Sequence, residues 1–343
     1  MSKNIFIIAE AGVNHNGELN LGFRLIDKAW ESGADAVKFQ TFRAENLVSK
    51  NAARAEYQEK NMPEIKESQF QMLKRLELSF TDFIKLKEYC DKKKIIFLST
   101  PFDFESVDFL NDLVPAFKIS SGDLTNLPFL EYAAKKNKPV ILSTGMSTLD
   151  EVRTAVSSIR KAQGCCGDSD FPALTLLHCS TNYPCPYKEV NLRALQALKD
   201  AFGLPVGYSD HTLGIEVSIA AAALGARVIE KHFTLDKNTA GPDHRASIEP
   251  DELKAMVKAI RNVEMSLGDG VKKPGINELR VSNVARRSLV AARDLKEDEI
   301  IQRDMLVIKR PGNGIQPSEL EKVIGLKLKR DKQQDAILLW EDF

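Results

Sequence analysis

The stretch from Pro205 to Phe233 reads PVGYSDHTLGIEVSIAAAALGARVIEKHF, and it decides the fold prediction. It begins with one short apolar run, Pro205–Ser209, and ends with a second, Arg227–Phe233. Runs of this length and composition are typical of buried parallel strands. The intervening GIEVSIAAAALGA has helical spacing, with a glycine near its end. The stretch therefore predicts a strand, a helix and a second strand.

The same alternation covers the first 233 residues of the chain. Eight apolar runs are each followed by a segment with helical spacing: Ile5–Ala9, Ala36–Thr41, Ile95–Thr100, Ala116–Ser121, Pro139–Thr144, Leu174–Ser180, Pro205–Ser209 and Arg227–Phe233. Eight such units in roughly 250 residues predict an α/β fold, a (β/α)₈ TIM barrel. A doubly wound open sheet is the competing fold, but it more often carries Gly-x-Gly-x-x-Gly after its first strand, and that turn is missing here.

The chain is expected to divide into two domains. Residues 1–268 form the predicted barrel, residues 269–284 a Gly-, Pro- and Lys-rich linker, and residues 285–343 a small α+β domain. So small a domain has a marginal core alone, so we expect it to dock on the barrel or on a neighbouring subunit. Residues 44–71 are long and polar for a connection inside a barrel, which predicts a lid or a specificity loop over the substrate.

Composition narrows the partners. The 343 residues hold 48 Lys and Arg against 48 Asp and Glu, so no bulk field attracts nucleic acid or anionic lipid. The apolar run before Glu10 is too short for a signal segment or a membrane span. The five cysteines form an odd set without Cys-x-x-Cys spacing, which favours a reducing cytoplasm. We therefore predict a cytoplasmic protein with a small-molecule partner, no nucleic acid and no membrane.

Polar residues fall at the carboxyl ends of nearly all eight runs, which is the face where barrels build active sites. Side chains alternate along a strand, so Glu230 and His232 share one face and Lys231 takes the other. The same rule pairs Lys38 with Gln40, and it also pairs Lys118 with Ser120. Two lysines ringed by Ser and Thr hydroxyls suit a compact dianion, for which phosphate is the natural candidate.

Two histidines follow neighbouring strands, His211 after the seventh run and His232 within the eighth. Both lie near acidic residues, which suits imidazole ligands of an open divalent site. The pattern does not choose among Mn²⁺, Fe²⁺, Co²⁺ and Zn²⁺. The alternative is that each histidine separately is a hydrogen-bonding residue of the core. Asp243, in GPDHRAS after the eighth run, faces the same rim or simply forms a turn.

In chain order, AEAGVNHNG, DAVKFQT, LSTPF, FKISSGD, ILSTGM, HCSTNYP, VGYSDHTLG, IEKHFTLD and GPDHRAS resemble the N-acetylneuraminate synthase family over essentially the whole chain. RRSLVAARDL and KRPGNGIQP resemble that family's antifreeze-like (SAF) domain. The resemblance implies an enzyme that joins phosphoenolpyruvate to open-chain N-acetylmannosamine. Phosphate leaves by carbon–oxygen cleavage, and N-acetylneuraminate is the expected product.

The resemblance also implies roles for single residues. His211 and His232 would hold the metal, usually Mn²⁺, and Asp123 would join through water; the family often has Glu there, so direct ligation by Asp123 stays open. The predicted contacts to phosphoenolpyruvate are Lys38, Thr100, Lys118 and Ser209, and Thr181 stands at a further position of that kind. Glu10, Gln40, Tyr183 and Asp243 would line the sugar, and Ser120 is a predicted substrate contact. Some members have Asn where this chain has Thr181.

Arg310, in KRPGNG, matches a family arginine that reads the N-acetyl group from the small domain of the partner subunit. The resemblance thus implies a domain-swapped homodimer. Without it, Arg310 would be ordinary surface charge beside a Pro-Gly turn.

The expected chemistry places the lysine-held phosphoenolpyruvate against the sugar aldehyde on the metal, with Glu10 or Asp123 as the base for water. A class I aldolase with a Schiff base on Lys118 is one rival. A catalytically silent sugar-binding protein is the other. Within the favoured function, N-acetylmannosamine is preferred as substrate, and a 2,4-diacetamido-trideoxy hexose that gives legionaminate is the alternative.

Overall fold

The computed structural model describes residues 5–62, 66–164 and 169–343. The chain consists of two compact units, Met1–Gly268 and Asp269–Phe343. The segment 269–284, expected to be a linker, carries most of the helix α12 (Ile276–Ala285) within the second unit.

The first unit is built on eight strands, β1 (Phe6–Gly12), β2 (Ala36–Thr41), β3 (Ile96–Pro101), β4 (Phe117–Ile119), β5 (Val140–Ser143), β6 (Leu174–Cys179), β7 (Val206–Asp210) and β8 (Val228–His232). Their pairings are parallel, in the order β3-β2-β1-β8-β7-β6-β5-β4. The two end strands, β3 and β4, also lie beside each other, so the sheet curves into a nearly closed barrel. The predicted TIM barrel is confirmed.

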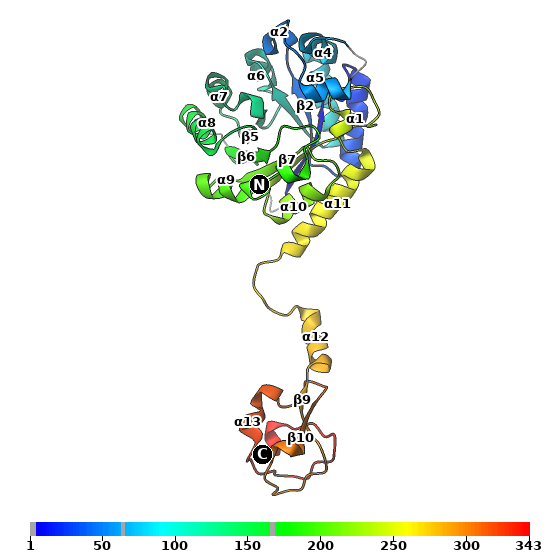
Figure 1. Cartoon of the computed structure of the whole chain (residues 1–343), viewed down its shortest axis with the longest axis vertical. Coiled ribbons are helices and arrows are strands. Elements are labelled where there is room, and N and C mark those ends of the chain that lie inside the picture. The colour runs from blue at the N-terminus through cyan, green and yellow to red at the C-terminus, as the bar shows by residue number, and fades with distance from the viewer. Residues whose placement is uncertain (1–4, 63–65, 165–168) are drawn as a thin grey trace. The chain divides into compact units, whose positions relative to one another are not determined.

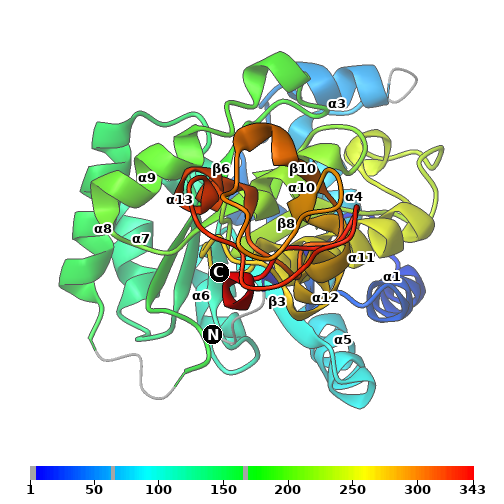
Figure 2. The same cartoon turned by 90° about the horizontal axis from the view of Figure 1, so that it is seen from below.

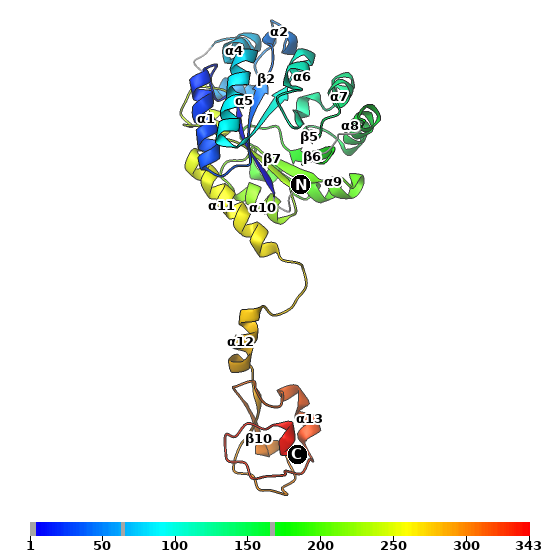
Figure 3. The ribbon, with the colours of Figure 1, turned by 180° about the vertical axis from the view of Figure 1, so that it is seen from behind.

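Helices surround the strands of this unit, as the opposite views of Figures 1 and 3 show. In Figure 2, α7 and α8 lie outside the strands on one side, with α1 and α5 on another. The helices are α1 (Leu19–Glu31), α2 (Ala44–Leu47), α3 (Glu56–Asn61), α4 (Gln69–Leu76), α5 (Phe80–Lys93), α6 (Phe104–Leu110), α7 (Leu127–Ala134), α8 (Leu149–Ala162), α9 (Ala194–Phe202), α10 (Glu216–Ala223) and α11 (Pro250–Leu267).

Local sequence explains where these helices begin and end. At the start of α8, the Thr148 hydroxyl accepts a hydrogen bond from the Glu151 backbone N–H, and the Glu151 carboxylate accepts one from the Thr148 backbone N–H. Asp103 caps α6 in the same way by accepting from the Ser106 N–H at 2.8 Å. At the other end of α9, Gly203 takes a left-handed conformation that closes the helix.

Alternation along the strands separates the barrel interior into two layers. One layer is apolar and fully buried: Ile8, Ala36, Leu98, Ala116, Ile141, Leu177 and Val228. The residue two positions further along each of these strands shares its face, and this second layer is polar: Glu10, Lys38, Thr100, Lys118, Ser143, Cys179 and Glu230. The apolar layer therefore forms a floor, and the polar layer above it faces the carboxyl ends of the strands.

The outward faces of the strands pack against the helices and form the main core, which includes Val37, Phe39, Phe97, Phe117 and Ile229. A smaller cluster anchors the segment after β2. Met62, Met72 and Leu76 pack there with Val13 and Phe42.

Residues 44–71, predicted to be a lid or specificity loop, contain α2, α3 and the start of α4, and residues 63–65 lie outside the described part. The segment is tied down by Asn61, whose Nδ2 donates to the Pro242 carbonyl at 2.6 Å. It is tied to itself by the Gln69 N–H, which donates to Ala52 O at 3.1 Å.

The second unit pairs β9 (Ser288–Ala291) with β10 (Leu306–Lys309) in an antiparallel sheet and contains the short helix α13 (Leu320–Val323). Its core contains Leu289, Leu295, Ile301, Ile315, Val323, Leu328 and Leu338. This small α+β unit agrees with the predicted C-terminal domain. None of the helices in residues 5–62, 66–164 and 169–343 has the length and apolar character needed to cross a bilayer.

Candidate active site

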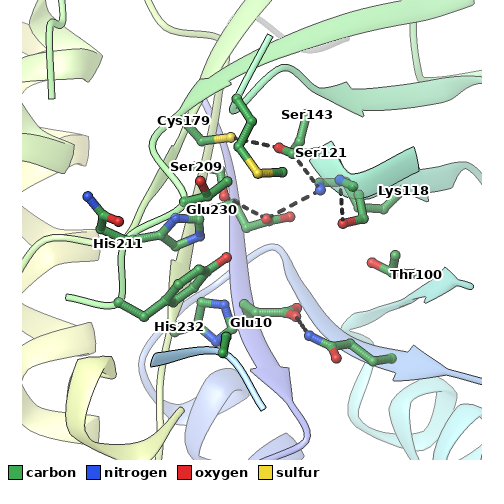
Figure 4. Close-up of a pocket in the computed structure, with 18 of the residues that line it drawn as sticks. Glu10, Thr100, Lys118, Ser121, Ser143, Cys179, Ser209, His211, Glu230 and His232 are labelled. Atoms are coloured by element: carbon green, nitrogen blue, oxygen red, sulfur yellow. Dashed lines mark hydrogen bonds and ion pairs between the residues drawn. The ribbon is translucent and has the colours of Figure 1, made fainter. Parts of the chain in front are cut away.

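A cavity of about 850 Å³ lies above the polar layer of the barrel. Figure 4 shows its side chains, with His211 and His232 on one side, Lys118 and Thr100 on the other, and the two carboxylates between them. Eleven of the residues proposed from the sequence line it: Glu10, Lys38, Gln40, Thr100, Lys118, Ser120, Thr181, Tyr183, Ser209, His211 and His232. Residues from all eight strand ends are thus brought to one space.

Four charged side chains of the polar layer form a row in which negative and positive charges alternate: Glu10, Lys38, Glu230 and Lys118. The Lys38 ammonium lies 2.8 Å from Glu10 and 3.8 Å from Glu230, and Lys118 lies 3.5 Å from Glu230. Ser209 adds a hydrogen bond to Glu230 at 2.8 Å. All four charged side chains are buried. Since a buried charge is costly without a partner, each lysine has a carboxylate neighbour.

Burial and these neighbours shift the pKa of each group. Burial raises the pKa of Glu10 to about 7, against the opposing effect of Lys38. Burial alone would also raise the pKa of Glu230, but Lys118 and Lys38 together hold it well below its usual range. For Lys38, burial is outweighed by Glu10 and Glu230, which raise its pKa, whereas burial lowers the pKa of Lys118. Glu10 is the carboxylate able to exchange a proton near neutral pH.

The lysines also have hydroxyl partners. Lys38 Nζ donates to Thr100 Oγ1 at 2.8 Å, and Lys118 Nζ donates to Ser143 Oγ at 2.7 Å. Ser120 and Ser209 also line the cavity, which therefore offers two cations and several hydroxyl donors. Such a set suits a small anion that bears both a phosphate and a carboxylate group.

The opposite side of the cavity holds the two histidines, whose ring centroids lie 5.6 Å apart. His211 Nδ1 contacts the Ser180 carbonyl, which fixes the ring and leaves Nε2 for another partner. His232 Nδ1 is buried, and within the described residues it has no hydrogen-bond partner. Burial lowers the pKa of His211 to about 4 and that of His232 well below its usual value, so both rings are neutral, as metal ligands must be.

The donor set therefore fits a divalent metal held by two imidazoles. No third His, Cys, Asp or Glu completes a metal-binding group with them in the described parts of the chain. The remaining coordination positions would fall to water or substrate oxygens, as in an open catalytic site.

Three predicted residues are not among those lining the cavity. Asp123 ends the short 3-10 turn Ser121–Asp123 and accepts from Asn126 Nδ2 at 3.3 Å. Asp243 is buried just before a second such turn, His244–Ala246. Burial raises the pKa of Asp243 to about 6, although the positive charge of Lys38 acts to lower it. Arg310 belongs to the second unit.

Several lining residues were not predicted as site residues. Glu230 is the most important, and its signal was present, because alternation placed it on the face of His232. Cys179 was not assigned either; its thiol lies 3.1 Å from Ser121 Oγ. Phe102, Met146 and Gln69 add contacts that no local pattern marks as functional.

Comparison with known proteins places this fold and site. Residues 25–272 match the model of the NeuB family, and residues 286–343 match that of the SAF domain. A Legionella pneumophila protein named N,N'-diacetyllegionaminic acid synthase is 50% identical over 99% of this chain and 95% of its own length. A Campylobacter jejuni protein of the same name is 51% identical over 98% and 99%.

A solved structure of an N-acetylneuraminic acid (sialic acid) synthetase from Leptospira borgpetersenii is 38% identical, covers 81% of this chain and 90% of its own, and superposes with a TM-score of 0.69. The fold and the site define a TIM-barrel enzyme of sugar-acid synthesis. The chain belongs to the NeuB family, with a SAF domain at its C-terminus.

Proposed function

We propose that this enzyme condenses phosphoenolpyruvate with 2,4-diacetamido-2,4,6-trideoxymannose and releases phosphate and N,N'-diacetyllegionaminate. The observation that carries the condensation is the single cavity with two lysines on one side and two neutral histidines on the other. The choice of sugar is supported by identities of 50% and 51% to the two legionaminic acid synthases, against 38% to the neuraminic acid synthetase. The sequence favoured N-acetylmannosamine; the relatives support its alternative better.

The lysine side binds phosphoenolpyruvate in this proposal. Lys38 lies near one carboxylate oxygen of Glu230 and Lys118 near the other. Lys38 also donates to Thr100, and Lys118 donates to Ser143. The two lysines can therefore bind the phosphate and the carboxylate group separately. Clamping both ends orients the methylene carbon toward the histidine side of the cavity. No lysine needs to act as a nucleophile.

His211 and His232 are the residues that would hold a divalent metal, and we propose Mn²⁺. When bound, the ion supplies Lewis-acid polarisation of the sugar aldehyde. The methylene carbon bonds to the aldehyde carbon, whose oxygen takes a proton and becomes a hydroxyl group. Water adds to the carbon that bears the phosphate and gives up its two protons, one to form that hydroxyl group and one to the leaving phosphate. The carbon–oxygen bond to phosphate breaks with its electron pair on phosphate, and a keto group remains.

Glu10 is the proposed proton carrier for the water. Its pKa is raised to about 7, and its Oε1 lies 3.3 Å from Gln40 Nε2 on the cavity wall. Asp123, the other candidate, is not among the lining residues, which favours Glu10.

Phosphate release with each sugar tests the proposal. The full-length chain with Mn²⁺ and phosphoenolpyruvate should release phosphate with the diacetamido sugar and much less with N-acetylmannosamine. The reverse preference would restore the neuraminate function, and no release with either would support a sugar-binding protein. Inactivation by borohydride in the presence of pyruvate would instead indicate a Schiff base on Lys118.

We further propose a homodimer in which Arg310 of one copy serves the barrel of the other. The apolar residues of α12 support it, since Ile276, Leu279, Val281 and Val284 are all exposed in the single chain. Mixing two inactive variants tests it: His211→Ala and Arg310→Ala should regain activity together after the dimers exchange subunits. A mixture that stays inactive although exchange is demonstrated contradicts the swap.

Three free buried cysteines, Cys90, Cys179 and Cys185, support a cytoplasmic location.

A further inference from the structure

Two charged residues face away from the cavity, on the side of the barrel wall that packs against the helices. Asp210 ends β7 and Lys231 lies in β8, and neither side chain has any exposed surface. Their neighbours on that side include the core residues Tyr208, Ile229 and Phe233. The Lys231 ammonium lies 3.0 Å from the Asp210 carboxylate, so they form an ion pair inside an apolar layer.

Both members of this ion pair make further hydrogen bonds. Lys231 also donates to the Thr212 carbonyl at 2.6 Å. Asp210 accepts from the Thr212 N–H at 2.9 Å, from Thr212 Oγ1 at 2.8 Å and from Ser218 Oγ on α10 at 2.7 Å. The Tyr208 hydroxyl makes a longer contact of 3.4 Å. The network thus holds the backbone on both sides of His211.

Stability is a weak explanation for this arrangement. Removing two charges from water costs about as much as their attraction returns, and well-packed apolar residues often serve a fold equally well. The strand register suggests another purpose. Asp210 pairs with Lys231 across β7 and β8, and the residue that follows each of them in the chain is a histidine of the candidate metal pair, His211 or His232.

We propose that Asp210 and Lys231 are positioning residues that fix the separation and orientation of His211 and His232. This inference rests on the proposed metal site. Lys231 directly precedes His232, and its side chain contacts Asp210 and Thr212, the residues before and after His211. The backbones that carry the two imidazoles are therefore tied together on the side away from the cavity. The contact of His211 Nδ1 with the Ser180 carbonyl fixes the same ring from a third strand end.

A fixed pair of ligands binds a metal more tightly, because less conformational freedom is lost on binding. Supporting residues behind the ligands of metal sites typically change metal affinity by about 10- to 100-fold. We expect a loss of that order when the Asp210–Lys231 tie is removed. Phosphate binding, which depends on Lys38 and Lys118 on the other wall, should change little.

The test is Mn²⁺ titration of the full-length double variant Asp210→Leu/Lys231→Met, which removes both charges and leaves neither unpaired. Visible spectra with Co²⁺ report the ligand geometry in the same proteins. The control is Asp35→Leu/Arg261→Met, because Asp35, just before β2, and Arg261 of α11 form an ion pair of 2.6 Å in the same barrel that is partly exposed and whose residues do not line the cavity. If the Asp210/Lys231 variant does not fold, Asp210→Asn/Lys231→Gln replaces it, because it keeps polar side chains at both positions and also leaves no charge unpaired.

We expect weaker Mn²⁺ binding and an altered Co²⁺ spectrum in the Asp210/Lys231 variant, with both unchanged in the control. Native affinity and an unaltered spectrum in a folded Asp210 variant would overturn the positioning role, as would an equal loss in the control. The His211→Ala variant distinguishes failure of the positioning role from failure of the metal site. If this variant binds Mn²⁺ as well as the native chain does, the metal site itself is refuted, and the positioning role is refuted with it.

Discussion

The ammonium of Lys38 lies 2.8 Å from the carboxylate of Glu10, and both side chains are almost completely buried. Each group therefore depends on the other for its charge state. Burial raises the pKa of Glu10 to about 7, while the carboxylates of Glu10 and Glu230 outweigh burial and raise the pKa of Lys38. The pair combines a permanent cation with a carboxyl group that can exchange a proton near neutral pH.

Lys38→Met should destabilise the barrel and abolish phosphate release. Breaking a buried ion pair typically costs about 3–5 kcal/mol, because the remaining charge is uncompensated. Urea unfolding measures the first effect. The double variant Lys38→Met/Glu10→Gln should recover much of the stability and none of the activity. A single variant as stable as the native chain would contradict the proposed dependence.

Glu230→Gln should make the protein more responsive to phosphate. Glu230 lies 3.8 Å from Lys38 and 3.5 Å from Lys118, so its loss leaves two buried cations undercompensated. Inorganic phosphate can replace that negative charge, and a ligand that binds only the native state raises the melting temperature. Thermal unfolding with and without phosphate measures it. Equal phosphate-induced shifts in variant and native chain would count against the anion site.

Asp243→Asn should become stabilising as pH rises. The pKa of Asp243 is raised from 3.8 to about 6 in the folded chain, so ionisation favours the unfolded state and native stability falls between these values. The shift corresponds to about 3 kcal/mol above pH 6, which the Asn variant avoids. Urea unfolding of both proteins from pH 4 to pH 7 gives the difference. Parallel stability profiles would show that Asp243 is not buried as a carboxylate.

Chelation should remove activity and Mn²⁺ should restore it. The two neutral imidazoles, whose ring centroids lie 5.6 Å apart, are the predicted metal ligands, and no third His, Cys, Asp or Glu forms a metal-binding group with them among the described residues. His211→Ala should be inactive at all Mn²⁺ concentrations, with unfolding that matches the native protein within about 1 kcal/mol, a typical effect for a single substitution. Full activity after exhaustive chelation would refute the metal requirement.

Most of the barrel followed from local sequence. All eight predicted strands exist, because short β-branched runs between amphipathic segments are consistent with only a few architectures. Their ends were less accurate. The run Ala116–Ser121 yields only Phe117–Ile119, since the Ser120 hydroxyl accepts from the Gly122 N–H and starts a 3-10 turn.

Eleven of the residues predicted as site residues line one cavity, and for those that lie within strands the reason is that alternation along a strand is a local property. The sequence alone did not assign Glu230 a role, because the need for a carboxylate between Lys38 and Lys118 appears only when β2, β4 and β8 face one another. The sequence pattern predicted that Lys231 faces away from the cavity, but it did not predict the ion pair of Lys231 with Asp210.

Residue patterns alone were enough to predict the order of the eight barrel strands along the chain, the face of the polar residues that lie within strands, and the family of enzymes to which the chain belongs. Which charges meet became clear only from the packing of the strands around the barrel. Local periodicity fixes the direction of a side chain, but distances across a barrel depend on how all eight strands tilt and pair, and that is a property of the closed sheet as a whole.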